Sequence, residues 1–180
     1  MKLSICIVTY RSRELLRSCI QSILENHPQQ DCEIIVVDNC SDDGTVEMLR
    51  SNFPFVQVIE NSSNRGYTGP MNQAFRLARG DYVVQLNPDT VIQPAAFERM
   101  LRFMDDHSNV GICSPKVLNR DGTLQKQCHR SEARPWDVLC YFLGLNRVFP
   151  KNPRFTGYLY ESRDEDETFP VEAVSGSVMM

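Results

Sequence analysis

Polar side chains follow four apolar, β-branched runs of the sequence, each at the point where a strand would end. The four polar groups are residues 9–11, 38–45, 61–66 and 87–89. In a parallel sheet the carboxyl ends of the strands share one edge, and ligands of open α/β sheets bind outside that edge. The four groups are therefore candidates for a single binding site.

Asp38 directly follows the run Ile34–Val37, so its carboxylate would stand at the edge of the sheet. A carboxylate there can accept a hydrogen bond from the N–H-bearing edge of a base such as uracil, thymine or guanine. Alternatively, Asp38 or Ser41 only caps the following helix, while Asp42 and Asp43 complement its dipole. The pattern alone supports the two interpretations about equally.

Asp89 places a second carboxylate after the fourth run. The sequence has no GxGxxG after the first run and no GxxxxGK[ST] motif, so a diphosphate would have to be held in another way. Mg²⁺ commonly takes only one or two protein carboxylates and also bridges diphosphate oxygens. A single aspartate after a strand is more often a turn residue or a cap, so the metal interpretation depends on the other motifs.

The segments that would position these groups alternate between strands and helices. The expected strands are Leu3–Val8, Ile34–Val37, Val56–Ile59, Tyr82–Leu86 and Val110–Cys113. Their nearly continuous apolar character is typical of strands buried on both faces. Apolar residues recur between them at helical spacing, in the sets Leu15, Leu16, Cys19, Ile20, Ile23, Leu24 and Met71, Ala74, Phe75, Ala78. The alternation predicts an α/β fold with a mostly parallel sheet and helices on both faces.

Length and composition narrow the remaining choices. A chain of 180 residues with 42% hydrophobic residues suits one globular domain. A net charge of -4 without a block of Lys and Arg excludes a nucleic-acid footprint. No apolar run is long enough for a transmembrane segment and no signal-peptide pattern opens the chain, so we expect a cytoplasmic location. The seven cysteines contain no CxxC pair, which indicates reduced thiols and disfavours a zinc site.

The motifs IVTY, VVDNCSDDGT, NRGYTGPMN and LNPDT occur in this order, and the later segments DGTLQ and AVSGSVMM extend the pattern over essentially the whole chain. Together they resemble the family-2 glycosyltransferases of the GT-A fold. The LNPDT form is particularly similar to the bacterial rhamnosyltransferase-like branch. The resemblance implies a Rossmann-like fold with a donor-binding half over residues 1–114. Residues 115–180 would begin an acceptor-binding half that is incomplete at the C-terminus.

The resemblance also implies roles for individual residues. They are Thr9, Tyr10, Arg11, Asp38, Asn64, Arg65, Gly66 and Asn87 for the nucleotide, Asn87 and Asp89 for Mg²⁺ or Mn²⁺, and Gly176 for the substrate. Two departures from the family pattern matter. Asn87 stands where the general pattern has an aspartate, which removes one negative charge from the metal site, and Pro70 and Ala74 stand where a glycine-rich form is frequent.

The activity implied is the inverting transfer of a sugar, with rhamnose as a candidate, from a dTDP-, UDP- or GDP-linked donor to a glycan or lipid-linked acceptor. Such transfer requires a general base, which in the family is acidic and lies downstream of a segment similar to Val174–Met180. We therefore expect no catalytic residue in this chain and little transfer by it. The alternative is a noncatalytic nucleotide-sugar-binding module. A peripheral position at the inner face of the membrane stays open.

Overall fold

The computed structural model describes residues 2–26, 32–160, 162–164 and 166–180. The chain divides into two compact units instead of the single domain that its length suggests. The first unit comprises Met1–Cys113 and Gly176–Met180, and the second comprises Ser114–Ser175. The end of the described chain thus belongs to the first unit. The division of roles between a donor half and an acceptor half remains a prediction.

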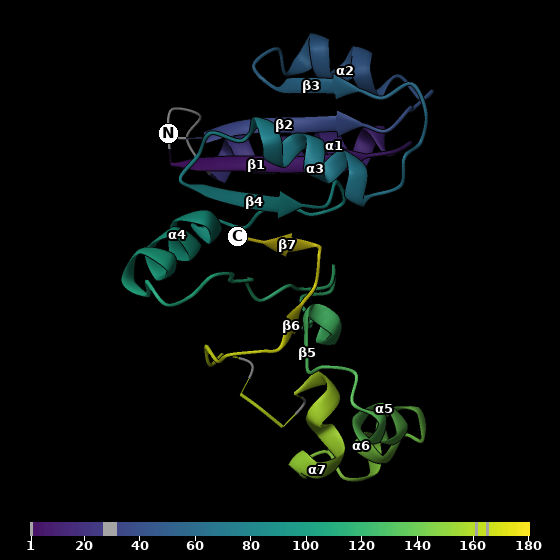
Figure 1. Ribbon diagram of the computed structural model, residues 1–180, viewed down its shortest axis with the longest axis vertical. Helices are drawn as coiled ribbons and strands as arrows, with labels where there is room; N and C mark the ends of the chain where they lie inside the picture. Colours follow the sequence, from purple (N-terminus) through teal and green to yellow (C-terminus); the bar gives the residue numbers. More distant parts are fainter. Residues whose placement is uncertain (1, 27–31, 161, 165) are drawn as a thin grey trace. The chain divides into compact units, whose positions relative to one another are not determined.

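The first unit is built on a five-stranded sheet in the order β3-β2-β1-β4-β7 (Figure 1). Strands β1 to β4 are parallel, and β7 runs antiparallel to β4. The strands are β1 Leu3–Thr9, β2 Cys32–Asp38, β3 Gln57–Glu60, β4 Tyr82–Leu86 and β7 Val178–Met179. The expected mostly parallel sheet is confirmed, and its central strand, β1, is buried at every position.

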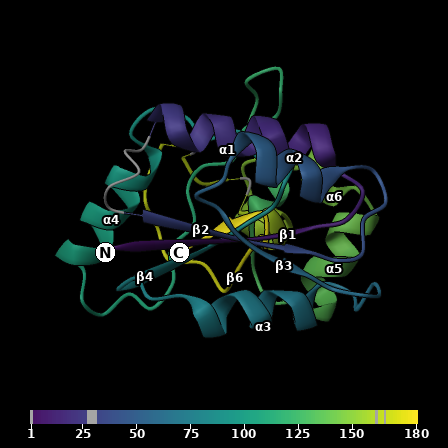
Figure 2. The same ribbon diagram turned by 90° about the horizontal axis from the view of Figure 1, so that it is seen from above.

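Helices cover both faces of this sheet. They are α1 Arg13–Asn26, α2 Thr45–Asn52, α3 Thr68–Leu77 and α4 Ala96–Asp106. Figure 2 shows α1 and α2 on one face and α3 on the other. Successive side chains of β1 point to opposite faces of the sheet and join two hydrophobic cores. Leu3, Ile5 and Ile7 pack in the core with α1, α2 and α4, whereas Cys6 and Val8 pack in the core with α3. Because both faces are covered, β1 is buried throughout, as its continuous apolar run predicts.

Three details of the sequence-based prediction are wrong. Val110–Cys113 is not a strand; the edge of β4 is occupied instead by β7, and Cys113 exchanges backbone hydrogen bonds of 2.9 Å with Met180. Leu15 and Phe75 were expected in the core but are exposed. Both lie at the margin of their helical stripe, where periodicity alone does not decide which side chains reach the sheet.

The second unit consists of short elements. They are η2 Lys126–Cys128, β5 His129–Arg130, α5 Pro135–Phe142, α6 Leu145–Val148, α7 Pro153–Thr156, η3 Gly157–Leu159 and β6 Ala173–Val174. Strands β5 and β6 pair antiparallel in a sheet of two strands. None of the helices in the described ranges is long and apolar enough to cross a membrane.

Gly80 approaches the backbone of β1 too closely to carry a side chain. A Cβ there would lie 2.6 Å from Ser4 N and 2.7 Å from Leu3 C. We expect Gly80→Ala to lower the free energy of unfolding by about 1–3 kcal/mol, because overpacking forces the backbone to shift. Urea titration measures this free energy.

Gly69→Ala is the matched control, since a Cβ at Gly69 would meet nothing within 4 Å. It should change stability by at most about 1 kcal/mol, and in the stabilising direction, because alanine has the higher helix propensity. Equal unfolding free energies for the two variants would contradict the close approach at Gly80.

Candidate functional site

The register of the sheet brings the ends of neighbouring strands to one level. Thr9 pairs with Asp38, Asp38 pairs with Glu60, and Ile7 pairs with Leu86. The loops that follow β1, β2, β3 and β4 therefore start from the same edge of the sheet, as expected for parallel strands. All of the residues that the sequence assigns to a donor site lie in the first unit.

Asp38 is buried at the end of β2, yet only one of its carboxylate oxygens has a partner. Oδ2 accepts a hydrogen bond of 2.9 Å from Ser41 N. Oδ1 is buried and has no hydrogen-bond partner among the described residues. Leaving a buried polar atom of this kind unsatisfied costs about 1–3 kcal/mol, and more for a charged group. Asp38 Oδ1 is thus a buried acceptor that no described residue satisfies.

Asn39, the next residue, joins the loop after β2 to the loop after β3. Its buried amide Nδ2 donates to Asn64 Oδ1 and to Gly66 O, both at 2.8 Å. Its Oδ1 accepts from Arg65 N at 3.0 Å. Asn64 Oδ1 accepts a further bond of 2.9 Å from Gly66 N, where the backbone has a positive φ of 71°. One side chain therefore sets the conformation of the whole segment Asn64–Gly66.

The loop after β1 is fixed mainly by the loop after β2. Arg11 N donates to Ser41 Oγ at 3.0 Å, and the Arg11 guanidinium forms an ion pair of 2.8 Å with Asp42. Arg11 and Cys40 both have positive φ, at 49° and 70°, a conformation that costs about 1 kcal/mol or more for a residue with a side chain. The guanidinium also lies over the Tyr10 ring, 5.2 Å from its centroid. These contacts hold Tyr10 and Arg11 beside Asp38.

Asp38 and Ser41 do not cap α2, whose N-cap residue is Gly44. Helix α2 follows Gly44, and the carboxylate nearest its start is that of Asp43, whose Oδ1 accepts from Thr45 Oγ1 at 2.5 Å and from Thr45 N at 3.2 Å. Partial burial would raise the pKa of Asp43, but hydrogen bonds from Thr45 and from Arg13 N lower it below its usual value. Asp43, and not Asp38, therefore contacts the first turn of α2, and a role of Asp38 in binding stays a prediction.

Asn87 is tied into the loop after β4 through its backbone and its side chain. Its N–H donates to Ser177 O at 2.9 Å, and its Oδ1 accepts from Tyr67 OH at 3.3 Å. Partial burial raises the pKa of Tyr67, so the phenol stays protonated and can donate. Cys19 Sγ lies 3.8 Å from Asn87 O, and burial, together with the negative charge of Asp89, raises the pKa of this thiol to about 12. Cys19 is therefore a protonated structural group here.

Asp89 is exposed, and its carboxylate forms no hydrogen bond or ion pair with the described residues. The described ranges contain no group of three or more His, Cys, Asp or Glu residues that could hold a metal ion. Asp89 and the Asn87 amide oxygen nevertheless fit a cation that keeps several water ligands and shares phosphate oxygens, because Mg²⁺ takes only hard oxygen ligands and few carboxylates. Asn87 has lone-pair capacity left beside its bond from Tyr67.

Gly176 lies against β4 at the start of the segment that returns to the first unit. Its carbonyl accepts a bond of 3.0 Å from Gln85 Nε2, and a Cβ at Gly176 would approach that nitrogen to 3.1 Å. Gly176 is thus one residue away from the Ser177 carbonyl that binds Asn87 N. A substrate role for Gly176 stays a prediction.

The structure connects most of the predicted site residues and adds others. Thr9, Tyr10, Arg11 and Asp38 are joined by backbone pairing and the Arg11 contacts, and Asn64, Arg65 and Gly66 are joined through Asn39. Asn39 and Asn61 lie in two of the polar groups singled out in the sequence but were given no role of their own, and Tyr67 and Gln73 lie outside those groups. Asn61 and Gln73 exchange two amide hydrogen bonds of 3.0 and 3.1 Å. A buried amide directly after a strand was the available sequence signal for Asn39.

The fold and the position of these residues define an open α/β protein with a candidate site at the carboxyl edge of a mostly parallel sheet. Residues 4–165 match the family model described as Glycosyl transferase family 2, and the chain belongs to this family. This match confirms the family to which the four motifs point. Assignment to the rhamnosyltransferase-like branch stays a prediction.

Curated relatives support the assignment. The chain is 28% identical to a poly(ribitol-phosphate) beta-glucosyltransferase of Bacillus spizizenii, over 96% of this chain and 29% of the relative. It is 31% identical to the abequosyltransferase RfbV of Salmonella typhimurium, over 79% and 44%. It is 29% identical to TarS of Staphylococcus aureus, a poly(ribitol-phosphate) beta-N-acetylglucosaminyltransferase, over 97% and 30%. The chain thus spans less than half the length of these relatives.

Solved structures show the same fold. The structure of S. aureus TarS in complex with UDP-GlcNAc matches with a TM-score of 0.60 and 27% identity, over 71% of this chain and 38% of that one. The mannosyltransferase PcManGT from Pyrobaculum calidifontis, in complex with GDP-Man and Mn²⁺, matches with a TM-score of 0.59 and 26% identity, over 66% and 36%. The expected GT-A-like architecture therefore agrees with these structural neighbours.

Asn39→Ala tests whether this amide sets the loop after β3. The change removes two donors and one acceptor from a buried position, so the free energy of unfolding should fall by about 1–3 kcal/mol. The Arg65 amide, which donates to Asn39 Oδ1, should exchange its hydrogen at least about tenfold faster, because 1.4 kcal/mol corresponds to a factor of ten. Hydrogen exchange followed by NMR measures this rate.

Asn72→Ala serves as the control, because Asn72 is exposed on α3. It should leave the Arg65 amide unchanged. An Arg65 exchange rate that is the same in Asn39→Ala and in the unsubstituted protein would show that the loop is held by other contacts.

Proposed function

We propose that the first unit binds the nucleoside diphosphate part of a sugar donor at the edge formed by the loops after β1 to β4. The observation that supports this proposal most directly is the buried Asp38 Oδ1, which has no partner among the described residues. A buried carboxylate oxygen is stable in such a position when a bound group donates to it. The N–H on the pairing edge of uracil, thymine or guanine supplies that donor.

The arrangement around Asp38 suits a flat base. Tyr10 is exposed beside the strand end, with the Arg11 guanidinium above its ring. An aromatic ring and a guanidinium plane are both groups on which bases stack in proteins. The Asp42 carboxylate forms an ion pair with the Arg11 guanidinium, so the loop does not present an unpaired cation next to Asp38. We infer that Tyr10 and Arg11 border the base and that the segment Asn64–Gly66 closes the same pocket.

Comparison with relatives supports a nucleotide-sugar donor without identifying it. The solved neighbours contain UDP-GlcNAc, UDP and GDP-Man. Their names are the basis for proposing a hexose or an N-acetylhexosamine linked to UDP or GDP as donor. The dTDP-rhamnose candidate rests on the LNPDT motif alone. Asp38 accepts equally well from thymine, uracil and guanine, so the base must be found by titration.

A divalent cation fits the proposal at Asp89 and Asn87. PcManGT is solved with Mn²⁺, and both residues offer hard oxygen ligands next to the end of β4. When bound, Mg²⁺ or Mn²⁺ supplies Lewis-acid stabilisation of the diphosphate leaving group. In this chain Asp89 would hold the cation through its carboxylate, and Tyr67 would keep the Asn87 amide oriented.

The reaction that we propose is transfer of the sugar to a glycan or lipid-linked acceptor in cell-wall polysaccharide assembly, as the names of the poly(ribitol-phosphate) transferases suggest. A cytoplasmic location remains part of the proposal. Binding of a nucleotide sugar without transfer is the second candidate. Acceptor-dependent release of nucleoside diphosphate by this protein would reject that candidate and leave the donor-site proposal intact.

Asp38→Asn tests the contact with the base. The substitution keeps the shape of the side chain but can place an NH₂ group against the N–H of the base. We expect UDP, dTDP or GDP, whichever binds best, to bind about 10- to 100-fold more weakly, since a hydrogen bond to a charged group contributes about 1.5–3 kcal/mol. Isothermal titration calorimetry with these nucleotides and with ADP measures the change.

Asp106→Asn is the matched control at an exposed position at the end of α4. It should bind the nucleotide as the unsubstituted protein does. If Asp38→Asn folds normally and retains the original affinity, Asp38 does not contact the base.

Asp89→Ala tests the metal site separately. Nucleoside diphosphate at about 100 times its dissociation constant should stabilise the protein by about 2.7 kcal/mol, and we expect this gain to require Mg²⁺ or Mn²⁺. The variant should lose the metal-dependent part and keep the part that the nucleotide gives alone. Thermal unfolding with nucleotide, metal, both or neither measures each part. Asp81→Ala, at another exposed position of the first unit, should behave like the unsubstituted protein, and the same loss in both variants would exclude a specific role for Asp89.

A further inference from the structure

Helix α5 and the segment that follows it expose large apolar side chains within the second unit. Trp136, Leu139 and Leu143 are spaced as neighbours on one side of α5, and all three are exposed. Phe142 is 80% exposed and Val148 is 66% exposed. Cys140, which adjoins Trp136 and Leu143 at helical spacing, is buried, and α5 contacts α6 and α7, so the exposed arc of the helix ends at Cys140. The exposed residues Trp136, Leu139, Phe142, Leu143, Val148 and Phe149 form what we call the α5–α7 surface.

The same segment concentrates positive charge in an acidic protein. Between Val138 and Tyr160 the sequence has three cations, Arg147, Lys151 and Arg154, and no Asp or Glu. Taking these three from the total of 19 Lys and Arg leaves 16 cations against 23 acidic residues in the rest of the chain. All three are exposed and form no ion pair with the described residues.

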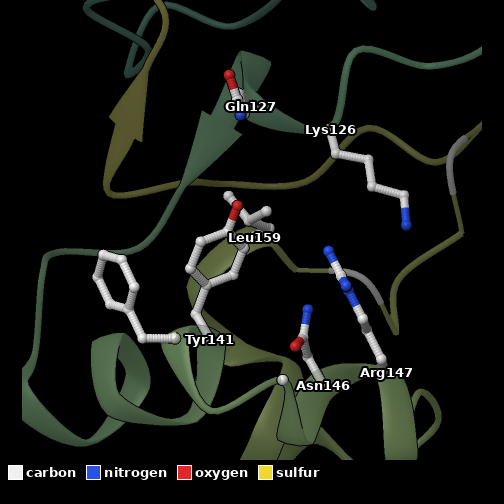
Figure 3. A pocket seen from close by; sticks show the side chains of 8 residues that line it. Lys126, Gln127, Tyr141, Asn146, Arg147 and Leu159 are labelled. Atoms are coloured by element: carbon white, nitrogen blue, oxygen red, sulfur yellow. The ribbon is translucent and has the colours of Figure 1, made fainter.

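The cations lie at the margin of the apolar side chains. The Arg154 guanidinium is 5.9 Å from the centroid of the Trp136 ring, and Trp136 Nε1 donates to Arg154 O at 3.1 Å. Arg147 and Lys126 extend into the same cavity of about 360 Å³, which Tyr141 and Phe142 also line (Figure 3). Cations thus lie beside exposed apolar side chains at two places in the second unit.

We propose that the α5–α7 surface docks on the face of a lipid bilayer that contains anionic lipid. Trp136, Phe142 and Leu143 would enter the boundary between headgroups and acyl chains, where aromatic and aliphatic side chains are favoured. Arg147, Lys151 and Arg154 would contact the lipid phosphates. Basic side chains beside an anionic surface each contribute about 1 kcal/mol, or about fivefold in affinity.

Charge favours a membrane over a second copy of this chain as the occupant. Two α5–α7 surfaces facing each other would bring Arg147, Lys151 and Arg154 of both copies together, and Asp137 is the single carboxylate that the sequence has between residues 135 and 160. Like charges that meet in an interface cost affinity. A bilayer with anionic headgroups provides both an apolar layer and the opposite charge. The proposal does not depend on the donor site, which lies in the first unit.

The sole tryptophan of the chain, Trp136, lies in this surface and reports on docking directly. The protein is mixed, without nucleotide, with phosphatidylcholine vesicles or with vesicles in which about a third of the lipid is phosphatidylglycerol. We expect co-sedimentation and a shift of Trp136 emission to shorter wavelength with the anionic vesicles, and a weaker response with the neutral ones. High salt should reduce binding because the charges are screened.

Two sets of variants separate the apolar and the charged contributions. Phe142→Ser with Leu143→Ser should abolish the emission shift, and Arg147→Gln with Lys151→Gln should weaken vesicle binding about 25-fold. The matched controls are Phe55→Ser and the pair Arg99→Gln with Arg102→Gln, which change exposed residues of the first unit. The controls should bind as the unsubstituted protein does.

Several outcomes would overturn the proposal. They are no sedimentation with either vesicle type, equal binding by the α5–α7 variants and their controls, or conversion of a dimer to a monomer by Phe142→Ser without any binding to vesicles. The last result would identify a second copy as the occupant. Because the assay contains no nucleotide, its failure leaves the donor-site proposal untouched, and failure of nucleotide binding leaves this one untouched.

Discussion

The buried polar pair at the end of β2 is the constraint on which the site of the first unit depends. Asp38 and Asn39 follow an apolar run and are themselves almost fully buried, at 2% and 3% exposure. Burial of polar groups is costly unless their hydrogen bonds are made. Asn39 meets this requirement through the loop after β3, and Asp38 meets it for only one of its oxygens. The burial of this pair therefore has two results: Asn39 fixes the loop after β3, and Asp38 keeps one carboxylate oxygen without a partner among the described residues.

In the loops after β1 and β2, contacts between the loops offset the backbone strain and the negative charge. Arg11 and Cys40 have left-handed backbone conformations, and Asp42 and Asp43 stand close together in sequence. Each carboxylate has a separate cation or set of N–H donors: Arg11 for Asp42, and Thr45 with Arg13 N for Asp43. Charge near the strand ends is thereby balanced locally, and the backbone strain is held by contacts between neighbouring loops. A site built in this way needs little rearrangement when a ligand arrives.

Sequence patterns predicted those parts of the fold that follow from local periodicity and burial on both faces. The continuous runs of β1, β2 and β4 were interpreted correctly because strands that are covered on both faces carry apolar residues at successive positions. The prediction of a strand at Val110–Cys113 was wrong because a short apolar run does not show which strand it would pair with. The edge of β4 pairs instead with β7, which lies near the end of the chain. Asp38 was identified by position, but the importance of Asn39 arises from contacts with residues 61–66, which no local pattern contains.

The second unit shows the opposite relation between sequence and structure. Its irregular segments gave no expected strands or helices with defined bounds, although Pro135 at the start of α5 is a position that proline favours. Helix α5 is apolar on nearly all sides, so periodicity could not separate a buried face from an exposed one. The packing of α5 on α6 and α7 makes that distinction, because it buries Cys140 and leaves Trp136, Leu139 and Leu143 outside. The apolar surface with cations beside it therefore arises only when the unit folds. Large exposed apolar patches of this kind are typical of surfaces that contact a partner or a membrane.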